Sequence, residues 1–167
     1  MRELVAGDFN KLLHYLGQLS DSTKSRFGPH AFDAAAVIAF YNQPGITGYA
    51  AIDNSNDTII AYSIIKEGML LHDRERLLRY GYTGVENSCC TYAPSVADAW
   101  QGKGVGRIVF SYILARCVEK GLHRIILWGG VQATNERALQ FYKKLGFVTL
   151  GQFEYNGHNL DMLLEVK

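Results

Sequence analysis

The chain is poor in cysteine and proline, with three of each among 167 residues, and its charges almost cancel. Two of the cysteines, Cys89 and Cys90, are neighbours, so the set does not form the disulfide framework of a small secreted protein. No Cys-x-x-Cys pair or histidine-rich cluster has the spacing of zinc ligands. We therefore expect a reduced, cytoplasmic protein that holds no metal.

Strong charge of one sign and long apolar runs are absent as well. Seventeen lysines and arginines face sixteen aspartates and glutamates, so the net charge of +1 gives no overall field to attract nucleic acid or an anionic membrane. Residues 1–10 lack the apolar core of a signal peptide, and no run is long enough to span a bilayer. The length suits one domain over residues 1–167 that binds neither nucleic acid nor membrane.

Hydrophobic periodicity predicts a mixture of strands and helices along the chain. Strands are expected at residues 4–5, 46–52, 58–65, 86–97, 123–131, 147–155 and 158–166. Helices are expected at residues 9–19 with Asp8 as the N-cap, at 31–41, from 105 to about 120, and from a cap at Thr134 or Asn135 to Gly146. Asn156-Gly157 is a strong hairpin signal, whereas the structure of residues 67–85 stays open. This order indicates an α/β or α+β domain built on a mixed sheet.

A glycine loop, Gln101-Gly102-Lys103-Gly104-Val105-Gly106, stands between the strand expected at 86–97 and the helix that follows. At such a helix start the N–H groups have no intrahelical acceptor and the helix dipole is positive, so a phosphate is the natural ligand. The loop lacks the Gly-Lys-Ser/Thr ending of a P-loop, and Val109 stands where a dinucleotide fingerprint needs its third glycine. The spacing thus favours a diphosphate site of another kind.

A second motif lies on the helix that Thr134 or Asn135 caps. Asn135, Ala138 and Tyr142 are at positions i, i+3 and i+7, which places all three on one side of that helix. Taken alone, apolar and aromatic residues at this spacing are usually part of a core. The motif continues through Gly146-Phe147 and follows the glycine loop after one further strand.

Together, Gln-x-x-Gly-x-Gly and Asn-x-x-Ala-x-x-x-Tyr-x-x-x-Gly-Phe resemble the core motifs of the GNAT superfamily of acyltransferases. The resemblance is best from about Glu86 onward, while the first half agrees in the order of its elements. Residues 19–27 also resemble a segment of GNAT domains that modify proteins, with one residue fewer. The resemblance implies a single GNAT-like domain with a mixed, mostly antiparallel central sheet flanked by helices, in which a bulge splays the acetyl-CoA strand.

The resemblance also implies acetyl-CoA as the acyl donor. The loop backbone would hold the CoA diphosphate, with Lys103 and Arg107 as charge partners, and Val96 and Ala97 would bond the pantetheine arm through backbone groups. Asn135 would face this arm, and Tyr142 would sit near the thioester sulfur. The implied cofactor-binding residues are Val96, Ala97, Gln101, Gly102, Lys103, Gly104, Val105, Gly106, Arg107, Asn135, Ala138 and Tyr142.

Acetyl transfer to an amine needs the amine in its neutral form. A lysine-like amine has a pKa of ~10.4, so deprotonating it at neutral pH costs roughly 4.6 kcal/mol. A base or a water relay is therefore expected. The N–H of Val96 would stabilise the oxyanion of the tetrahedral intermediate, and the phenol of Tyr142 would protonate the departing thiolate.

The identity of the base is where the sequence departs from the family pattern. Cys90 occupies the position, eleven residues before Gln101, where histone-modifying members have a glutamate. Glu86 faces the same side of the expected strand, about 13 Å away, and would act through water or merely cap the sheet. His72 and Asp73 are further candidates, and Cys90 fits a buried small hydrophobe better than an acyl-enzyme nucleophile. Tyr142 and Glu86 are thus the expected catalytic residues.

The sequence therefore predicts an N-acetyltransferase that moves an acetyl group from acetyl-CoA to a primary amine by direct attack in a ternary complex. The acceptor is a protein lysine, an N-terminus or a small amine. Two alternatives stay open, namely a non-catalytic acyl-CoA-binding or sensing module with the same fold, and a nucleotide-binding fold of other chemistry. Residues 147–166 also offer strand edges through which two copies could pair as a homodimer.

Overall fold

The computed structural model describes residues 1–83 and 88–166, and its internal contacts divide into two compact units. Unit 1 comprises residues 1–66 and 93–116, and unit 2 comprises residues 67–92 and 117–167. The chain passes between the units three times, at residues 66–67 and 92–93 within strands and at residues 116–117 within a helix. No helix in the described part of the chain is long and apolar enough to cross a bilayer.

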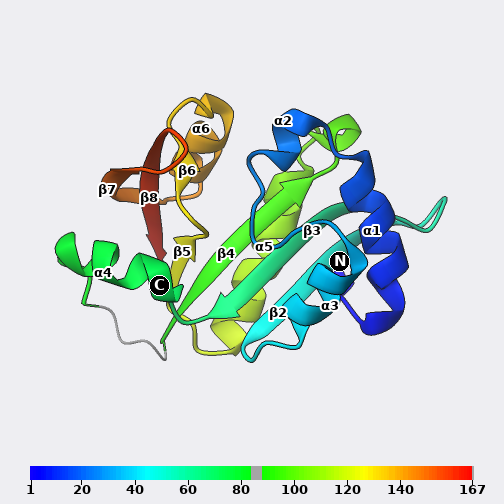
Figure 1. Cartoon of the computed structure of the whole chain (residues 1–167), viewed down its shortest axis with the longest axis horizontal. Coiled ribbons are helices and arrows are strands. Elements are labelled where there is room, and N and C mark those ends of the chain that lie inside the picture. Colours follow the sequence, from blue (N-terminus) through cyan, green and yellow to red (C-terminus); the bar gives the residue numbers. More distant parts are fainter. Residues whose placement is uncertain (84–87, 167) are drawn as a thin grey trace. The chain divides into compact units, whose positions relative to one another are not determined.

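Unit 1 combines three N-terminal helices with a hairpin and with parts of two later elements (Figure 1). In chain order its elements are β1 (Arg2–Glu3), α1 (Phe9–Gln18), α2 (Asp21–Lys24), α3 (Ala34–Tyr41), β2 (Ile46–Asp53) and β3 (Thr58–Glu67). The second half of β4 (Cys89–Val96) and most of α5 (Val105–Glu119) complete it.

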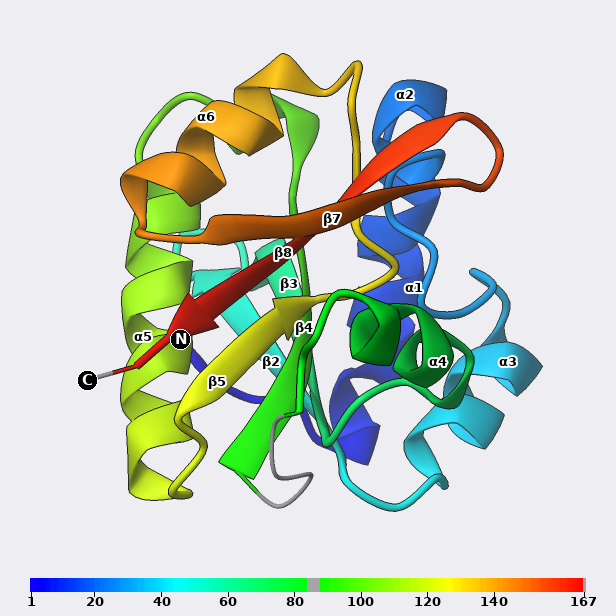
Figure 2. The ribbon, with the colours of Figure 1, turned by 90° about the vertical axis from the view of Figure 1, so that its left-hand side faces the viewer.

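In unit 1, β1, β2 and β3 pair antiparallel, and β3 also contacts the residue that follows β4. β2 and β3 pair antiparallel from Ile46 opposite Lys66 to the turn at residues 54–57, and β1 joins the other edge of β2. Just beyond β4, the N–H of Ala97 donates to the carbonyl of Ile60 in β3 over 2.9 Å. Figure 2 shows α5 on one side of β2 and β3, with α1 and α3 on the other.

Helix α1 forms because its apolar residues recur at helix spacing. Leu12 and Leu16 are fully buried and Tyr15 is almost so, which gives the helix one face that packs in the core of unit 1. Asp8 is the N-cap residue of this helix, as expected, but its side chain makes no hydrogen bond to the helix. Its carboxylate instead caps the 3-10 turn before the helix by accepting from the N–H of Val5 at 3.0 Å, and the ion pair with Arg2 holds it there.

Unit 2 contains the remaining strands and helices. In chain order they are α4 (Leu71–Arg79), the first half of β4, the end of α5, β5 (Arg124–Leu127), β6 (Val131–Gln132), α6 (Glu136–Lys144), β7 (Val148–Glu154) and β8 (His158–Glu165). β4 and β5 pair in parallel from Cys89 opposite Arg124 to Tyr92 opposite Leu127, which covers the first four residues of β4. The other pairs in this unit, β5–β8, β6–β8 and β7–β8, are antiparallel.

The chain thus has the expected α/β fold with mixed, mostly antiparallel strand pairing. The bulge expected in β4 stays a prediction. The hairpin at Asn156-Gly157 is confirmed, because both residues adopt the positive φ of a tight hairpin turn, 48° and 109°. The helix cap at Asn135 is confirmed as well.

Several expected boundaries are wrong. The apolar run at 123–131 divides into β5 and β6, because Gly129 and Gly130 have φ values of 62° and 72° that end the first strand. The first strand is at Arg2–Glu3 rather than 4–5. The helix expected at 31–41 begins at Ala34, where the side chain of Asp33 accepts from the N–H of Ala36.

Helix α4 occupies part of the stretch whose structure the sequence left open. Its Arg76 forms two hydrogen bonds with Asp161 of β8, of 2.7 and 3.0 Å, and one of 2.8 Å with Asp73. The same guanidinium lies 3.6 Å from the ring centroid of Phe153 in β7. Both carboxylates are buried, so this network attaches α4 to the β7–β8 hairpin.

Candidate functional site

The glycine loop, which the sequence predicts to bind a diphosphate, contains two glycines with positive φ. Gly102 and Gly104 have φ values of 76° and 83°, which only glycine adopts without strain. Within residues 1–83 and 88–166, nothing accepts a hydrogen bond from the N–H groups of residues 102–104. Val105 and Gly106 are the first residues of α5, so their N–H groups have no intrahelical acceptor either. Five successive N–H groups are therefore available to an anion at the positive end of a 15-residue helix.

Gln101 ties the start of this loop to the end of β4. Its side-chain Nε2 donates to the carbonyl of Val96 at 3.1 Å and to the hydroxyl of Thr23 at 3.3 Å. The carboxylate of Asp98 accepts from the N–H and hydroxyl of Ser20 at 2.9 and 2.8 Å, and from the hydroxyl of Thr23 at 2.7 Å. These bonds hold the pKa of Asp98 below its usual value, with the N–H of Ser20 as the largest cause. The start of α2 is thereby fixed beside the loop.

The backbone of Ala97 is already engaged within unit 1. Its N–H donates to Ile60, as described above, and its carbonyl accepts from the N–H of Trp100 at 2.8 Å. Since the carbonyl of Val96 also accepts from Gln101, the backbone bonds expected from these two residues to the pantetheine arm stay a prediction. Lys103 and Arg107 are exposed, and the Lys103 ammonium lies 5.5 Å from the Trp100 ring centroid. Both cations thus lie at the surface beside the loop.

The second predicted group of site residues lies on α6, in unit 2. The side chain of Asn135 caps the helix by accepting from the N–H of Ala138 at 3.3 Å, which leaves its NH₂ group as the donor for a ligand. The ring of Tyr142 is buried between Phe141 and Phe147, with centroid distances of 5.3 Å to each. Burial raises the pKa of the Tyr142 phenol, so it remains protonated at neutral pH.

The candidates for the base differ in their surroundings. Glu86 lies outside the described residues. Cys90 is fully buried with its Sγ 3.7 Å from that of Cys117, and this contact and burial raise the pKa of its thiol. The expected role of Cys90 as a buried small residue is confirmed. Asp73 is paired with Arg76, and the exposed His72 lies beside it at 3.4 Å.

Sequence reasoning missed two groups of contacts in unit 1. One is made by Asp98, whose contacts join the loop to α2. The other is a line of hydrogen bonds through His30, Tyr62 and Tyr41. Asp98 could have been identified from its position directly after the expected strand. Nothing in the spacing of His30, Tyr41 and Tyr62 indicates that their side chains are in contact.

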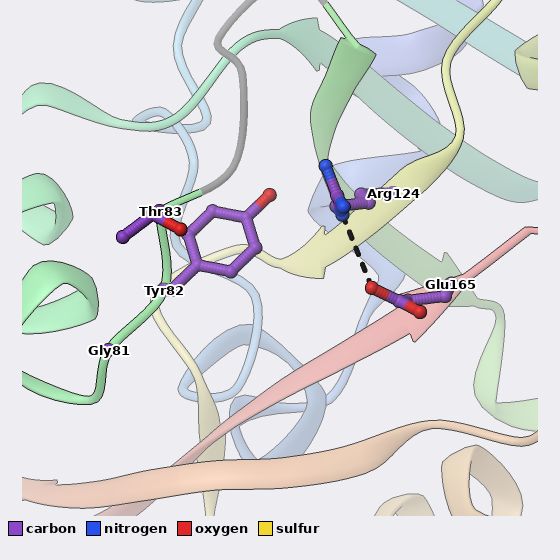
Figure 3. Close-up of a pocket in the computed structure, with 5 residues that line it drawn as sticks. All are labelled: Gly81, Tyr82, Thr83, Arg124 and Glu165. Carbon is purple, nitrogen blue, oxygen red and sulfur yellow. Dashed lines mark hydrogen bonds and ion pairs between the residues drawn. The ribbon is translucent and has the colours of Figure 1, made fainter.

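A surface pocket in unit 2 is distinct from these residues. Its volume is about 190 Å³, and Figure 3 shows its lining residues, Gly81, Tyr82, Thr83, Arg124 and Glu165. Arg124 and Glu165 form an ion pair of 3.3 Å at its rim. None of the five was predicted to bind acetyl-CoA, so the pocket carries no part of the predicted donor site.

The family model described as the acetyltransferase (GNAT) family matches residues 16–147. This match covers most of the chain, so the protein belongs to the GNAT family. A mycothiol acetyltransferase from Corynebacterium aurimucosum is 38% identical over 56 residues, which are 34% of this chain. The matched segment spans only 18% of that relative's length.

Solved structures share the fold over nearly the whole chain at low sequence identity. The GNAT domain of S. lividans PAT has a TM-score of 0.74 and 20% identity, with 99% of this chain and 89% of that one covered. The ribosomal-protein-S18-alanine N-acetyltransferase from Escherichia coli has a TM-score of 0.70 and 16% identity, with 99% and 92% covered. A mutant spermidine N-acetyltransferase from Vibrio cholerae has a TM-score of 0.71 and 17% identity, with 98% and 93% covered. These likenesses identify the GNAT fold.

Proposed function

We propose that this protein is an N-acetyltransferase that transfers the acetyl group of acetyl-CoA to a primary amine. The observation that carries the proposal is the row of five available N–H groups at residues 102–106, at the N-terminus of α5. Phosphate oxygens accept hydrogen bonds from such a row, and the helix dipole favours their negative charge. Membership of the GNAT family, whose acyl donor is acetyl-CoA, makes the CoA diphosphate the ligand of choice.

In the proposed reaction the neutral amine attacks the thioester carbonyl carbon and the carbon–sulfur bond breaks. The N–H of Val96 stabilises the oxyanion, and the CoA thiolate takes a proton from the Tyr142 phenol. The acceptor ammonium loses two of its three protons. One goes to water and the other replaces the proton that Tyr142 gives to the thiolate, so the products are the amide, the CoA thiol and one proton. Burial raises the pKa of Tyr142, so the phenol holds its proton until the thiolate forms, as a weaker acid than an exposed phenol.

The names of three similar proteins supply a first set of acceptors to test. They point to spermidine, to an alanine of ribosomal protein S18 and to the chemistry of mycothiol. We propose no choice among these acceptors, because the matched proteins are either distant in sequence or matched over a short segment.

The proposal is tested in two steps with the intact chain. Calorimetry compares acetyl-CoA with ATP and NAD, and we expect acetyl-CoA to bind at least tenfold more tightly, the equivalent of ~1.4 kcal/mol. Release of free CoA thiol is then followed with spermidine, an alanine-initiated peptide and a lysine peptide. Tight binding of acetyl-CoA without turnover of any amine favours the non-catalytic binding module, and preferential binding of ATP or NAD contradicts both.

A further inference from the structure

A single 3-10 turn, Asp98–Trp100, carries the chain from the end of β4 to the glycine loop. The N–H of Gln101 closes this turn by donating to the carbonyl of Asp98 at 3.3 Å. The position of the loop relative to β4 therefore depends on what holds the turn. Two side chains do so, because Asp98 is bonded to α2 and Gln101 is bonded back to the end of β4.

Helix α2 is a firm support for this turn. Leu19, directly before the helix, is buried, and Ser20 caps the helix by accepting from the N–H of Thr23 at 3.3 Å. The ammonium of Lys24, at the other end of the helix, donates to a backbone carbonyl of α1 at 3.0 Å. Figure 1 shows α2 beside the end of β4. The bonds to Asp98 thus connect the turn to a segment that is itself attached to α1.

The Asp98 carboxylate decides the direction of the hydrogen bonds that reach Gln101. An ionised carboxylate only accepts, so the single hydroxyl hydrogen of Thr23 is donated to Asp98 over 2.7 Å. The Thr23 oxygen then has only lone pairs left, and it accepts from Nε2 of Gln101 at 3.3 Å. The same NH₂ group donates its other hydrogen to the carbonyl of Val96 at 3.1 Å. These three bonds form one directed line from Val96 to Asp98.

The line excludes the opposite orientation of the Gln101 amide. A turned amide would place its oxygen where Nε2 lies, facing the carbonyl oxygen of Val96 and the oxygen of Thr23, whose hydrogen is already donated. Oxygen would then face oxygen in both contacts, with no hydrogen between them. If the carboxylate is removed, the Thr23 hydroxyl can donate to a turned amide, and the bond from Gln101 to Val96 is lost in that orientation. The carboxylate thus favours the one orientation that ties the loop to β4.

We propose that Asp98 is a positioning residue for the acyl donor, because through Thr23 it orients the Gln101 amide that holds the glycine loop on the end of β4. The proposal rests on the proposed N-acetyltransferase function, which assigns residues 102–106 to the diphosphate of acetyl-CoA. The role requires no contact between Asp98 and the donor. Loss of the carboxylate should loosen the loop, so that its N–H groups are no longer preorganised and acetyl-CoA binds less tightly.

The test is a double-mutant cycle in the full chain. Asp98→Ala, Gln101→Ala and the double variant are compared with wild type by calorimetry with acetyl-CoA. Asp33→Ala is the matched control, because the side chain of Asp33 also caps a helix of unit 1, by accepting from the N–H of Ala36 at 2.9 Å at the start of α3. Circular dichroism and a thermal melt establish that each variant is folded.

We expect Asp98→Ala and Gln101→Ala each to weaken acetyl-CoA binding about fivefold, the effect of one net hydrogen bond. Since Asp98 acts through Gln101, the double variant should bind within about twofold of Gln101→Ala, whereas independent roles would multiply to about 25-fold. Asp98→Glu keeps the charge and should recover part of the loss. Asp33→Ala should bind acetyl-CoA as wild type does.

Thr23→Val is a second way to break the line. It has nearly the shape of threonine, and it removes both the donor to Asp98 and the acceptor for Gln101 while the bonds from Ser20 to Asp98 remain. We expect it to weaken acetyl-CoA binding about as much as Asp98→Ala does, again without an additional effect in Gln101→Ala. If Asp98→Ala fails to fold, Thr23→Val decides.

Two results would overturn the proposal. One is an acetyl-CoA affinity that stays within twofold of wild type in both Asp98→Ala and Thr23→Val. The other is a double variant whose loss of affinity equals the product of the two single losses, because Asp98 would then act independently of Gln101.

A measurement without ligand separates this proposal from the proposed function. If wild type binds no acetyl-CoA, or acetylates none of the amines, the function fails, and NMR of the Gln101 side-chain NH₂ group in the free protein still reports on Asp98. The signals of this group are assigned by their absence from Gln101→Ala. We expect its hydrogens to exchange with water about fivefold faster in Asp98→Ala and Thr23→Val than in wild type or Asp33→Ala. Equal exchange rates in all four proteins contradict the proposed role of Asp98.

Discussion

The side-chain amide of Gln101 donates to the backbone carbonyl of Val96 over 3.1 Å, which joins the first residue of the glycine loop to the last residue of β4. Val96 carries the proposed oxyanion donor, and Gln101 begins the proposed diphosphate site. One hydrogen bond therefore connects the residues that are proposed to bind the two ends of acetyl-CoA. A second bond from the same amide to Thr23 extends the connection to α2.

Replacing Gln101 with glutamate should weaken acetyl-CoA binding about tenfold and lower the free energy of unfolding by about 1 kcal/mol. The new carboxylate cannot donate to Val96, and it faces both the Asp98 carboxylate and the proposed diphosphate. Gln101→Ala is the control, because it removes the bond without adding charge and should cost less affinity. Calorimetry with acetyl-CoA and a urea melt measure the two effects, and equal affinities of the two variants would contradict the charge argument.

Gly104→Ala should separate the strain of the loop from its role in binding. The φ of 83° at Gly104 is unfavourable for alanine by about 1 kcal/mol, although no atom lies within 4 Å of the new Cβ. Gly121 is a matched control, with a φ of 69° and the same open space. We expect both variants to lose similar stability, and only Gly104→Ala to lose acetyl-CoA affinity, since its methyl group enters the proposed diphosphate site. Similar affinities in the two variants would argue against the loop as the donor site.

Tyr142→Phe tests the proposed proton donor. The ring packing against Phe141 and Phe147 is retained, so the variant should fold normally and bind acetyl-CoA as wild type does. We expect kcat to fall by about 10²-fold or more, in the range of general acid catalysis. Steady-state kinetics with the best acceptor amine measures this. Full turnover by the variant would remove the phenol from the mechanism.

The local elements and the glycine loop were predictable because each depends on residues close in sequence. The cap at Asn135, the Asn156-Gly157 turn and the positive φ values in the loop before α5 all follow from the chemistry of a few neighbouring positions. The single strand expected at 123–131 was wrong because Gly129 and Gly130 form a turn inside the apolar run. Hydrophobic periodicity alone does not distinguish one strand from two strands separated by a turn.

The contacts between distant segments were not predictable in the same way. Tyr62 and His30 are 32 positions apart, and Arg76 and Asp161 are 85 apart. Tyrosine and histidine are intermediate in burial, and the charged side chains of α4 predict a solvent-exposed helix. Neither pattern indicates which distant residue is the partner. The general base could not be predicted for the same reason. The position before the loop where a glutamate was expected holds the buried Cys90, so any base must come from elsewhere in the chain or from water.

Arg76→Met should destabilise the protein strongly, by about 3–5 kcal/mol, because it leaves two buried carboxylates without their partner. Asp73 and Asp161 have side chains that are 3% and 1% exposed, and the arginine is 20% exposed. Arg79→Met on the same helix is the control, because its pair with Glu75 is exposed and is worth no more than about 0.5 kcal/mol. Urea denaturation of both variants measures the difference. A loss below about 1 kcal/mol for Arg76→Met would show that water reaches the carboxylates.

The ion pair between Asp8 and Arg2 should make the stability depend on pH in the acid range. Hydrogen bonds from Arg2 are the largest cause that lowers the pKa of Asp8 to about 2, from an ordinary value of ~3.9. A lowered folded-state pKa means that the unfolded chain binds the proton first, so the stabilisation is present above pH ~4 and is lost as the pH falls towards 2. Asp8→Asn should remove this component of the pH dependence and cost about 1 kcal/mol at neutral pH. Asp57→Asn, which loses an exposed partner of Lys11, should retain the wild-type slope. Urea midpoints between pH 5 and pH 2 test this, and parallel curves for wild type and Asp8→Asn would show that the pair does not persist in solution.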